Sequence, residues 1–296
     1  MTRSQANLTL TLAALIWGIS FAFQKLAMDH MGPFLFNGLR FLIGGLVLLP
    51  LVYLMREKRR SRNRGASRHL FWGSAIAGIV MYAGAAFQQI GIIHTTVTNT
   101  GFITSLYMVL VPVLGIFLGH RYARGLWFAV LIACAGLYLI TGMYRGASLN
   151  YGDIMVFAGA LCWAVHVLAI DHLTSRHDQI LIAVIQFLVC ALFSLATALA
   201  VGEQMLPATA DGWTWILLSG VLSVGIGFTL QVVGQADAPP AQAAVILNLE
   251  AVFASAAGIL LFNEVLGIPV LMGCLLLLGG CLLAQKYPPL PAAHRA

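Results

Sequence analysis

The sequence is dominated by a succession of apolar runs, separated by short polar or Pro- and Gly-containing breaks. A bilayer core about 30 Å thick is crossed by a helix of roughly 20 apolar residues. Because a backbone in hydrocarbon must satisfy its own hydrogen bonds, such runs have to be helical. The pattern therefore predicts an all-α integral membrane protein with ten transmembrane helices. The predicted spans cover residues 7–27, 34–54, 70–92, 97–118, 125–143, 153–170, 179–201, 213–234, 241–262 and 267–286.

The composition excludes a water-soluble domain. Of the 296 residues, 60% are hydrophobic and only 9% are charged, whereas about 25% of the residues of a soluble domain are charged. A soluble enzyme, a nucleic-acid-binding protein and a disordered protein are thereby excluded. We expect a multi-pass protein whose surroundings are membrane lipids and which has no nucleic-acid partner.

The basic residues orient the predicted spans. With the N-terminus in the cytoplasm, thirteen of the 16 Lys and Arg residues fall in cytoplasmic segments, seven of them within residues 56–68, and only Arg145 falls outside. An excess of Lys and Arg marks cytoplasmic loops. Both termini are therefore predicted to be cytoplasmic.

The two halves of the chain resemble each other. Residues 14–18 in the first span match residues 160–164 in the sixth, and residues 104–109 in the fourth align with residues 247–252 in the ninth. Each half, 1–146 and 147–296, holds five predicted spans, so the second half enters the membrane inverted. Inverted repeats are typical of transporters, whose substrates bind near the midplane between the halves.

Several motifs then resemble a known family. The markers are Trp17, Trp163, Pro112 followed by Phe117-Leu118-Gly119, and the stretch Leu249-Glu250-Ala251-Val252-Phe253-Ala254. Over residues 7–286 the chain resembles the drug/metabolite transporter superfamily, in its EamA-type branch of two five-helix repeats. Within that branch it is similar to the bacterial YddG-type exporters of aromatic and other apolar amino acids. The sequence departs from the family pattern at Ala251, where proline is usual, and at His120, where glutamate is common.

The ninth span carries the one carboxyl group placed near the middle of a span, Glu250, and Asn248 two residues before it. Ionisable groups in hydrocarbon are costly and usually face a bundle interior or a wet cavity. Glu250 is therefore a candidate to bind a substrate ammonium or to carry a proton. The alternative interpretation is a protonated, hydrogen-bonded carboxyl that holds helices together.

Four aromatic residues, Trp17, Tyr82, Tyr107 and Trp163, also lie near the centres of their spans. Their N–H and O–H groups need partners there, which a hydrated cavity supplies. An aromatic-walled cavity suits flat or apolar side chains and attracts an ammonium through cation–π interaction. Ordinary helix packing is the alternative for each of these residues taken alone.

His166 adds a group that titrates near neutral pH and could carry protons, although a neutral histidine that joins two helices is the simpler interpretation. Gln88 and Gln231 are expected to join helices in the same way. Lys25 and Arg40 lie toward the outer ends of their spans, where long side chains reach the interface. That position argues against an anionic substrate.

No enzyme motif is present. The sequence has no GxSxG or HExxH pattern, and its five cysteines lie in apolar runs without a CxxC pair. We expect no metal, no cofactor and no catalytic residue. A channel would need a ring of like groups, whereas the chain has one mid-span carboxyl.

The favoured interpretation is a transporter of the bacterial inner membrane that exports aromatic and other apolar amino acids by alternating access. The sequence leaves the oligomeric state open, and a monomer is compatible with this function. A carrier of other amphipathic solutes, such as hydrophobic cations or vitamins, is the alternative.

Overall fold

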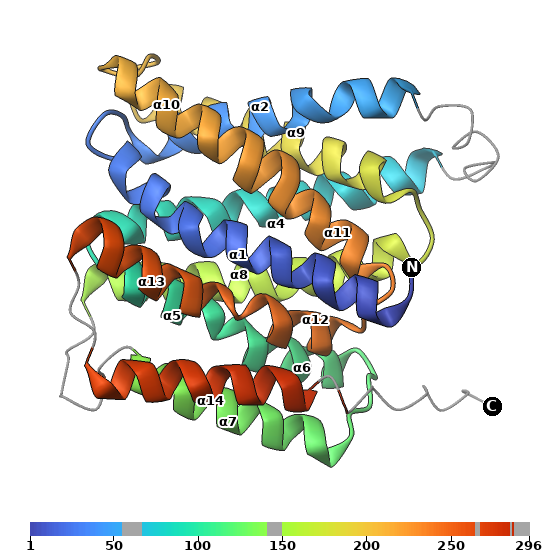
Figure 1. Cartoon of the computed structure of the whole chain (residues 1–296). Helices are drawn as coiled ribbons and strands as arrows, with labels where there is room; N and C mark the ends of the chain where they lie inside the picture. Colours follow the sequence, from blue (N-terminus) through green and yellow to red (C-terminus); the bar gives the residue numbers. More distant parts are fainter. Residues whose placement is uncertain (55–66, 141–149, 264–266, 285, 287–296) are drawn as a thin grey trace.

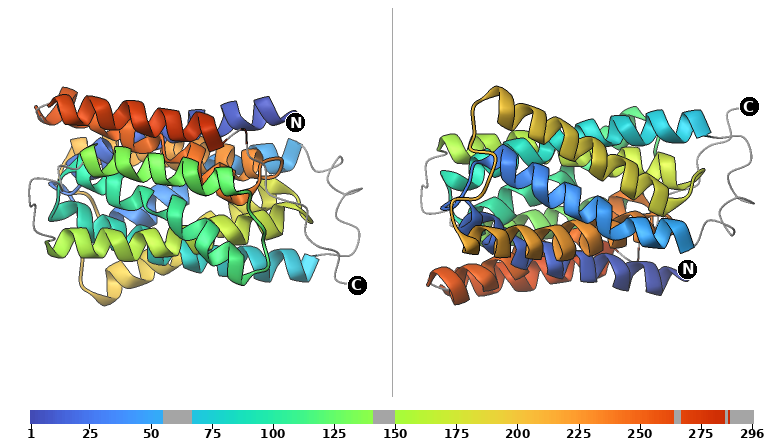
Figure 2. Two further views of the ribbon diagram at one scale, coloured as in Figure 1. Left: turned by 90° about the horizontal axis from the view of Figure 1, so that it is seen from below. Right: turned by 90° about the horizontal axis from the view of Figure 1, so that it is seen from above.

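The computed structural model describes residues 1–54, 67–140, 150–263, 267–284 and 286, and every regular element in these ranges is a helix. The helices lie side by side and run between the same two ends of the molecule (Figures 1 and 2). They are α1 (Arg3–Ala27), α2 (Pro33–Leu54), α4 (Ser67–Ile93), α5 (Val97–Ser105), α6 (Tyr107–Phe117), α7 (Arg124–Ile140), α8 (Tyr151–Thr174), α9 (Gln179–Ala200), α10 (Ala210–Leu218), η2 (Ser219–Phe228), α11 (Thr229–Gln235), α12 (Pro240–Leu247), α13 (Glu250–Phe262) and α14 (Ile268–Ala284).

Eight helical segments in the described part of the chain are long and apolar enough to cross a membrane. Three of these segments are composite, because α5 continues into α6, α10 into η2 and α11, and α12 into α13. The fifth and tenth predicted spans correspond to shorter apolar helices, α7 and α14, which pack against each other. The chain is therefore a multi-pass membrane protein.

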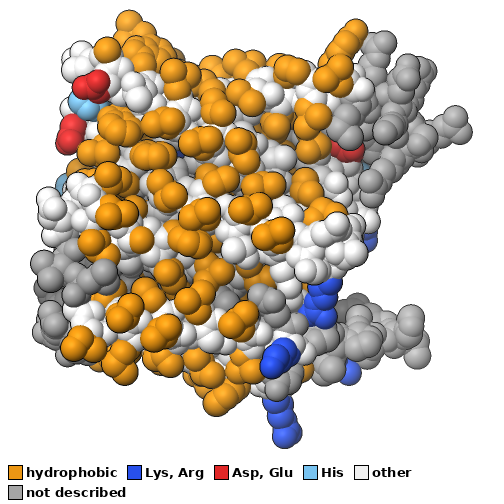
Figure 3. All heavy atoms as spheres, in the orientation of Figure 1, with side chains coloured by type: hydrophobic (Ala, Val, Ile, Leu, Met, Phe, Trp, Pro, Cys, Tyr) orange, Lys and Arg blue, Asp and Glu red, His pale blue; other side chains and the backbone are white. Residues whose placement is uncertain are grey.

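The surface matches this arrangement. Figure 3 shows apolar side chains covering the flank of the bundle, while Lys and Arg gather at the end that carries the N-terminus. Arg145 and residues 56–64 of the predicted basic loop lie outside the described residues. The exposed cations at the basic end are Arg3, Arg68, Arg121, Arg124, Arg176 and Lys286.

Local sequence explains where several helices begin. The Thr2 side chain accepts a hydrogen bond from the Gln5 amide and Gln5 bonds back to Thr2, which caps α1. Asn150 and Asp153 form the same reciprocal pair at the start of α8. Such boxes satisfy backbone donors that a first turn leaves unpaired.

The core lies between the two halves of the chain. Helix α4 packs against α8 and α9, α2 against α9 and η2, and α1 against α11, α12, α13 and η2. Each helix of the first half thus contacts mainly helices of the second half. A cavity in the middle of this bundle is lined from both halves.

Three central segments depart from regular α-helix. A 3₁₀ turn separates α5 from α6 at Leu106, whose amide bonds to the Ile103 carbonyl, and a second separates α12 from α13 at Leu249, whose amide bonds to the Ile246 carbonyl. The third is η2, a π-helix. Mid-helix 3₁₀ turns and π-helical segments often mark functional positions. Pro112 lies inside α6 and does not end it, although proline commonly interrupts a helix.

Candidate functional site

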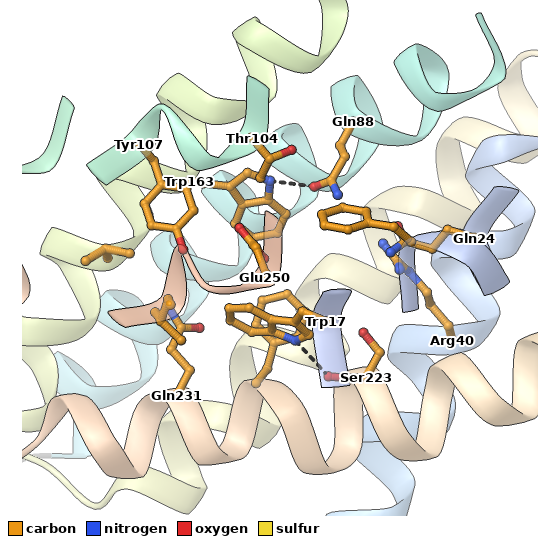
Figure 4. A pocket seen from close by; sticks show the side chains of 14 residues that line it. Trp17, Gln24, Arg40, Gln88, Thr104, Tyr107, Trp163, Ser223, Gln231 and Glu250 are labelled. Carbon is orange, nitrogen blue, oxygen red and sulfur yellow. Dashed lines mark hydrogen bonds between the residues drawn. The ribbon is translucent and has the colours of Figure 1, made fainter. Parts of the chain in front are cut away.

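A cavity lies between the two halves, and its walls combine aromatic rings with polar side chains (Figure 4). The ring of Phe228 sits between the two predicted tryptophans, with its centroid 4.5 Å from that of Trp17 and 5.6 Å from that of Trp163. Phe21 and Tyr107 complete the apolar wall. The predicted Trp pair thus contacts one shared ring.

The N–H group of each indole donates a hydrogen bond, as a buried donor within the membrane requires. Nε1 of Trp17 donates to the Ser223 carbonyl over 3.2 Å, and Nε1 of Trp163 donates to Oε1 of Gln88 over 2.7 Å (Figure 4). These bonds fix the orientation of both rings, since a buried polar group without a partner is costly.

Both indoles also rest on a glycine. A Cβ atom at Gly227 would lie 2.7 Å from Nε1 of Trp17, and one at Gly84 would lie 3.1 Å from Cε2 of Trp163. A methyl group at Gly227 would force the indole to shift, and one at Gly84 would require a smaller adjustment of the ring. The offset of 143 residues that relates Gly84 to Gly227 is also the offset between Tyr107 and Glu250.

The acidic side of the cavity is formed by Glu250, the first residue of α13, directly after the 3₁₀ turn. Glu250 is 2% exposed, and its Oε1 atom has no hydrogen-bond partner among the described residues. Its side chain interacts with Tyr107, the first residue of α6 (Figure 4). Oε1 of Gln231, across the cavity, is likewise buried without a partner in the described structure. The site therefore presents unused acceptors.

Arg40 corrects one sequence-based expectation. Its side chain is 3% exposed and lines the cavity, so it does not reach out to the membrane surface. The guanidinium carbon lies 5.0 Å from the ring centroids of both Phe36 and Phe41. Lys25 differs, because its Nζ donates to the carbonyls at the end of α4 and is absent from the cavity lining.

Four of the seven predicted site residues, Trp17, Tyr107, Trp163 and Glu250, line the cavity together. The other three have partners elsewhere in the bundle. The Tyr82 hydroxyl is 2.6 Å from Oγ1 of Thr197, Nε2 of His166 is 2.9 Å from Oε1 of Gln186, and Nδ2 of Asn248 donates to Sδ of Met108 over 2.6 Å. His166 still supports the site from behind, because its ring contacts Trp163 and Phe228.

Sequence reasoning missed several lining residues. Phe228 is one of 16 phenylalanines in an apolar chain, and no motif distinguishes it. Gln88 and Gln231 are expected to join helices, yet both line the cavity. Their spacing of 143 residues, equal to that between Tyr107 and Glu250, is the signal that could have identified them as a pair.

The cavity is small in this structure, about 40 Å³. A site for a drug-sized ligand occupies about 300–1,000 Å³, so the present space is too small for an aromatic side chain. The helices around it have to move apart before a solute of that size binds. Alternating access requires such a movement.

A second hollow of about 680 Å³ lies near the basic end, between α4, α6 and α8. His69, His120, His172 and Asp171 are on its lining, together with apolar residues. Nδ1 of His69 lies 2.9 Å from Nε2 of His177. The described residues contain no group of three or more His, Cys, Asp or Glu side chains arranged to hold a metal ion.

Known proteins resemble the chain over nearly its full length. It is 32% identical over 267 residues to an uncharacterized transporter of Archaeoglobus fulgidus, covering 89% of this chain and 80% of that protein. The uncharacterized transporter YvbV of Bacillus subtilis is 25% identical, covering 99% of this chain and 96% of its own. A protein crystal structure superimposes with a TM-score of 0.77 at 21% identity, covering 96% of this chain and 97% of the other, which supports the fold.

A family model described as the EamA-like transporter family matches twice, over residues 4–142 and 150–285. The two matches together cover almost the whole chain. They agree with the names of the relatives, which are transporters, and with the apolar helical bundle. The chain belongs to the EamA-like transporter family, a branch of the drug/metabolite transporter superfamily.

Proposed function

We propose that the protein exports aromatic and other apolar amino acids across the bacterial inner membrane, through the central cavity. The observation that carries this proposal is the composition of the cavity wall. Trp17, Trp163 and Phe228 form an aromatic surface, and the Glu250 carboxyl lies beside it with an unused acceptor. A flat apolar side chain fits the aromatic surface, and an ammonium group fits the carboxyl.

The energetic scale is adequate for a transporter. An aromatic pair contributes about 0.5–1.5 kcal/mol beyond its buried area, and a hydrogen bond to a charged group about 1.5–3 kcal/mol. A few such contacts give the modest affinity that a carrier needs in order to release its solute. The outward direction rests on the resemblance to YddG-type exporters.

The proposal includes a topology. The ten helical segments would form two inverted five-helix repeats, residues 1–146 and 147–296, with both termini in the cytoplasm. The double match of the family model and the basic end shared by the N-terminus and Lys286 support this arrangement. Opposite orientation of the halves provides two equivalent routes to the cavity, as alternating access requires.

A second candidate is a carrier of hydrophobic cations. The aromatic wall and the Glu250 carboxyl favour it, because both attract a positive charge. The buried Arg40 guanidinium on the lining of the same cavity opposes it.

Counterflow in proteoliposomes tests the proposal. Purified protein is reconstituted and preloaded with unlabelled phenylalanine, and the uptake of labelled phenylalanine, tryptophan, leucine, lysine and a quaternary ammonium ion is measured with and without a pH gradient. We expect saturable counterflow of the three apolar amino acids and none of lysine. Counterflow of the quaternary ammonium alone would replace the amino-acid proposal with the cation carrier.

A further inference from the structure

The cavity contains a buried positive charge with no negative partner in the described structure. Arg40 lies in α2, is 3% exposed and lines the cavity. In the part of the chain that the structure describes, Arg40 takes part in no ion pair. Nε of Arg40 is buried without a hydrogen bond in the same part of the chain.

A guanidinium at this depth needs compensation. A charged side chain within a bilayer is costly unless it is paired or hydrated. The rings of Phe36 and Phe41 supply part of this compensation, because a cation is attracted to the face of an aromatic ring. The rest of the compensation for the Arg40 charge has to come from water or from an anion that enters the cavity.

The positions of Arg40 and Glu250 in the cavity indicate which kind of anion fits beside Arg40. Figure 4 shows the Arg40 guanidinium beside Gln24, on the side of the cavity away from Tyr107, and the Glu250 carboxyl toward Tyr107. The indole of Trp17 lines the same cavity, and the ring of Phe228 packs against it with the two centroids 4.5 Å apart. The cavity thus has a cationic side, an acidic side and aromatic rings on its wall.

We propose that Arg40 binds the carboxylate of the transported solute, so that the site selects a dipolar molecule with a free carboxyl group. This inference rests on the proposed function and narrows it. The guanidinium fork matches a carboxylate in a bidentate pair. The ammonium group of the same solute faces Glu250, and its apolar side chain contacts Trp17, Trp163 and Phe228.

Selectivity follows from the two charged sides. A solute that lacks the carboxylate leaves Arg40 without a partner and adds a second positive charge to the cavity. A site that bonds a polar group of its substrate strongly rejects an analogue that lacks this group. The loss of a methylene group from the substrate has a much smaller effect on binding. Amines and hydrophobic cations are therefore poor substrates, although Glu250 and the aromatic wall attract them.

Three probes of similar size test the inference: phenylalanine, phenethylamine, which lacks the carboxylate, and 3-phenylpropionate, which lacks the ammonium. Their binding to purified protein is measured through the fluorescence of the cavity tryptophans and by competition in counterflow. For the wild type we expect phenylalanine to bind at least tenfold more tightly than phenethylamine. In Arg40→Gln we expect this ratio to fall to about one, while phenethylamine binds as well as before or better.

Two further variants make the experiment decisive. Arg121→Gln removes an exposed arginine outside the cavity and should keep the wild-type ratio. Arg40→Lys keeps the charge and loses the bidentate geometry, so the ratio should fall several-fold. If Arg40→Gln does not fold, the ratio of phenylalanine to phenethylamine affinity in Arg40→Lys tests the inference in its place.

An unchanged ratio in the folded Arg40 variants, or failure of both carboxylate probes to bind the wild type, would overturn the inference. Arg40-dependent binding of 3-phenylpropionate without any transport of phenylalanine would instead support the carboxylate subsite and reject only the proposed amino-acid function.

Discussion

At the scale of single residues, Glu250 is in an unusual position. It is buried at a break between two helices, interacts with Tyr107, and keeps one oxygen unused in the described structure. A carboxyl whose only task is to join helices would direct both oxygens at protein donors. The open acceptor favours a role in binding the solute.

We therefore expect Glu250→Gln to weaken transport about tenfold to a hundredfold, because an amide cannot pair with an ammonium and a charged hydrogen bond contributes about 1.5–3 kcal/mol. Asp211→Asn is the matched control, since it neutralises an exposed carboxyl at the start of α10. Counterflow of labelled phenylalanine measures both. Near-normal counterflow by Glu250→Gln at every pH would assign Glu250 to a structural role.

A second residue, His177, makes stability depend on pH. It lies between α8 and α9, where burial lowers the pKa of its side chain below the ordinary value of 6.5. The positive charges of His69, Arg176 and His172 lower the pKa of His177 further. In the unfolded chain the His177 side chain takes up a proton near pH 6.5, whereas in the folded protein it stays neutral to a lower pH. Stability from this group is complete above about pH 6.5 and is lost as the pH falls below it.

Thermal unfolding in detergent at about pH 7.5 and about pH 5.5 checks this sign. We expect the drop in melting temperature between the two values to be smaller in His177→Gln than in the wild type. His94→Gln, which replaces an exposed histidine, should keep the wild-type drop. An equal drop in all three proteins would contradict the assignment to His177.

At the scale of helices, the π-helix η2 sets the position of Trp17. Gly225 and Gly227, a residue type that weakens a regular helix, both lie within η2. Proline commonly interrupts a helix, yet the break in this span occurs at Leu106 and not at Pro112. The apolar pattern shows that a run is helical. A single 3₁₀ turn within the run is built from equally apolar residues, so the pattern does not reveal it. Neither 3₁₀ turn is therefore visible in the sequence.

The Gly227–Trp17 contact predicts the effect of a single methyl group. In Gly227→Ala the new Cβ would lie 2.7 Å from Nε1 of Trp17, so the indole has to shift. We expect transport to fall several-fold while the protein remains folded. Gly279→Ala on α14 is the control, because nothing lies within 4 Å of its added Cβ. Alanine there should leave transport unchanged and stabilise the helix by up to about 1 kcal/mol. Full activity of Gly227→Ala would show that the ring position is not critical.

At the scale of the whole molecule, the sequence predicted the helical bundle and its apolar surface well, because bilayer thickness and backbone hydrogen bonding leave few alternatives. It predicted the site less completely. Trp17 and Glu250 stand out by type and depth, but Phe228 and Arg40 become site residues only through the contacts of α2 and η2 with other helices. Such contacts join residues far apart in the chain, which a pattern of apolar runs does not specify.

The proposed topology gives a direct labelling test. In a variant without its five cysteines, a cysteine placed at Ser175, between α8 and α9, should react only from the cytoplasmic face. A cysteine at Ala208, before α10, should react only from the opposite face. Both positions are exposed, and they lie at opposite ends of the bundle. Reaction of both with an impermeant reagent from the same face would rule out the ten-span arrangement.

Gly84 and Gly227 are absent from the cavity lining, yet they set how far each indole extends into it. Two relatives with identical lining residues can therefore differ in what they carry, if one has a larger residue behind either tryptophan. Inferring the substrate of one relative from that of another, on the basis of identical lining residues alone, would overlook this difference. The same two positions offer a way to redesign the range of solutes without altering any side chain that touches them.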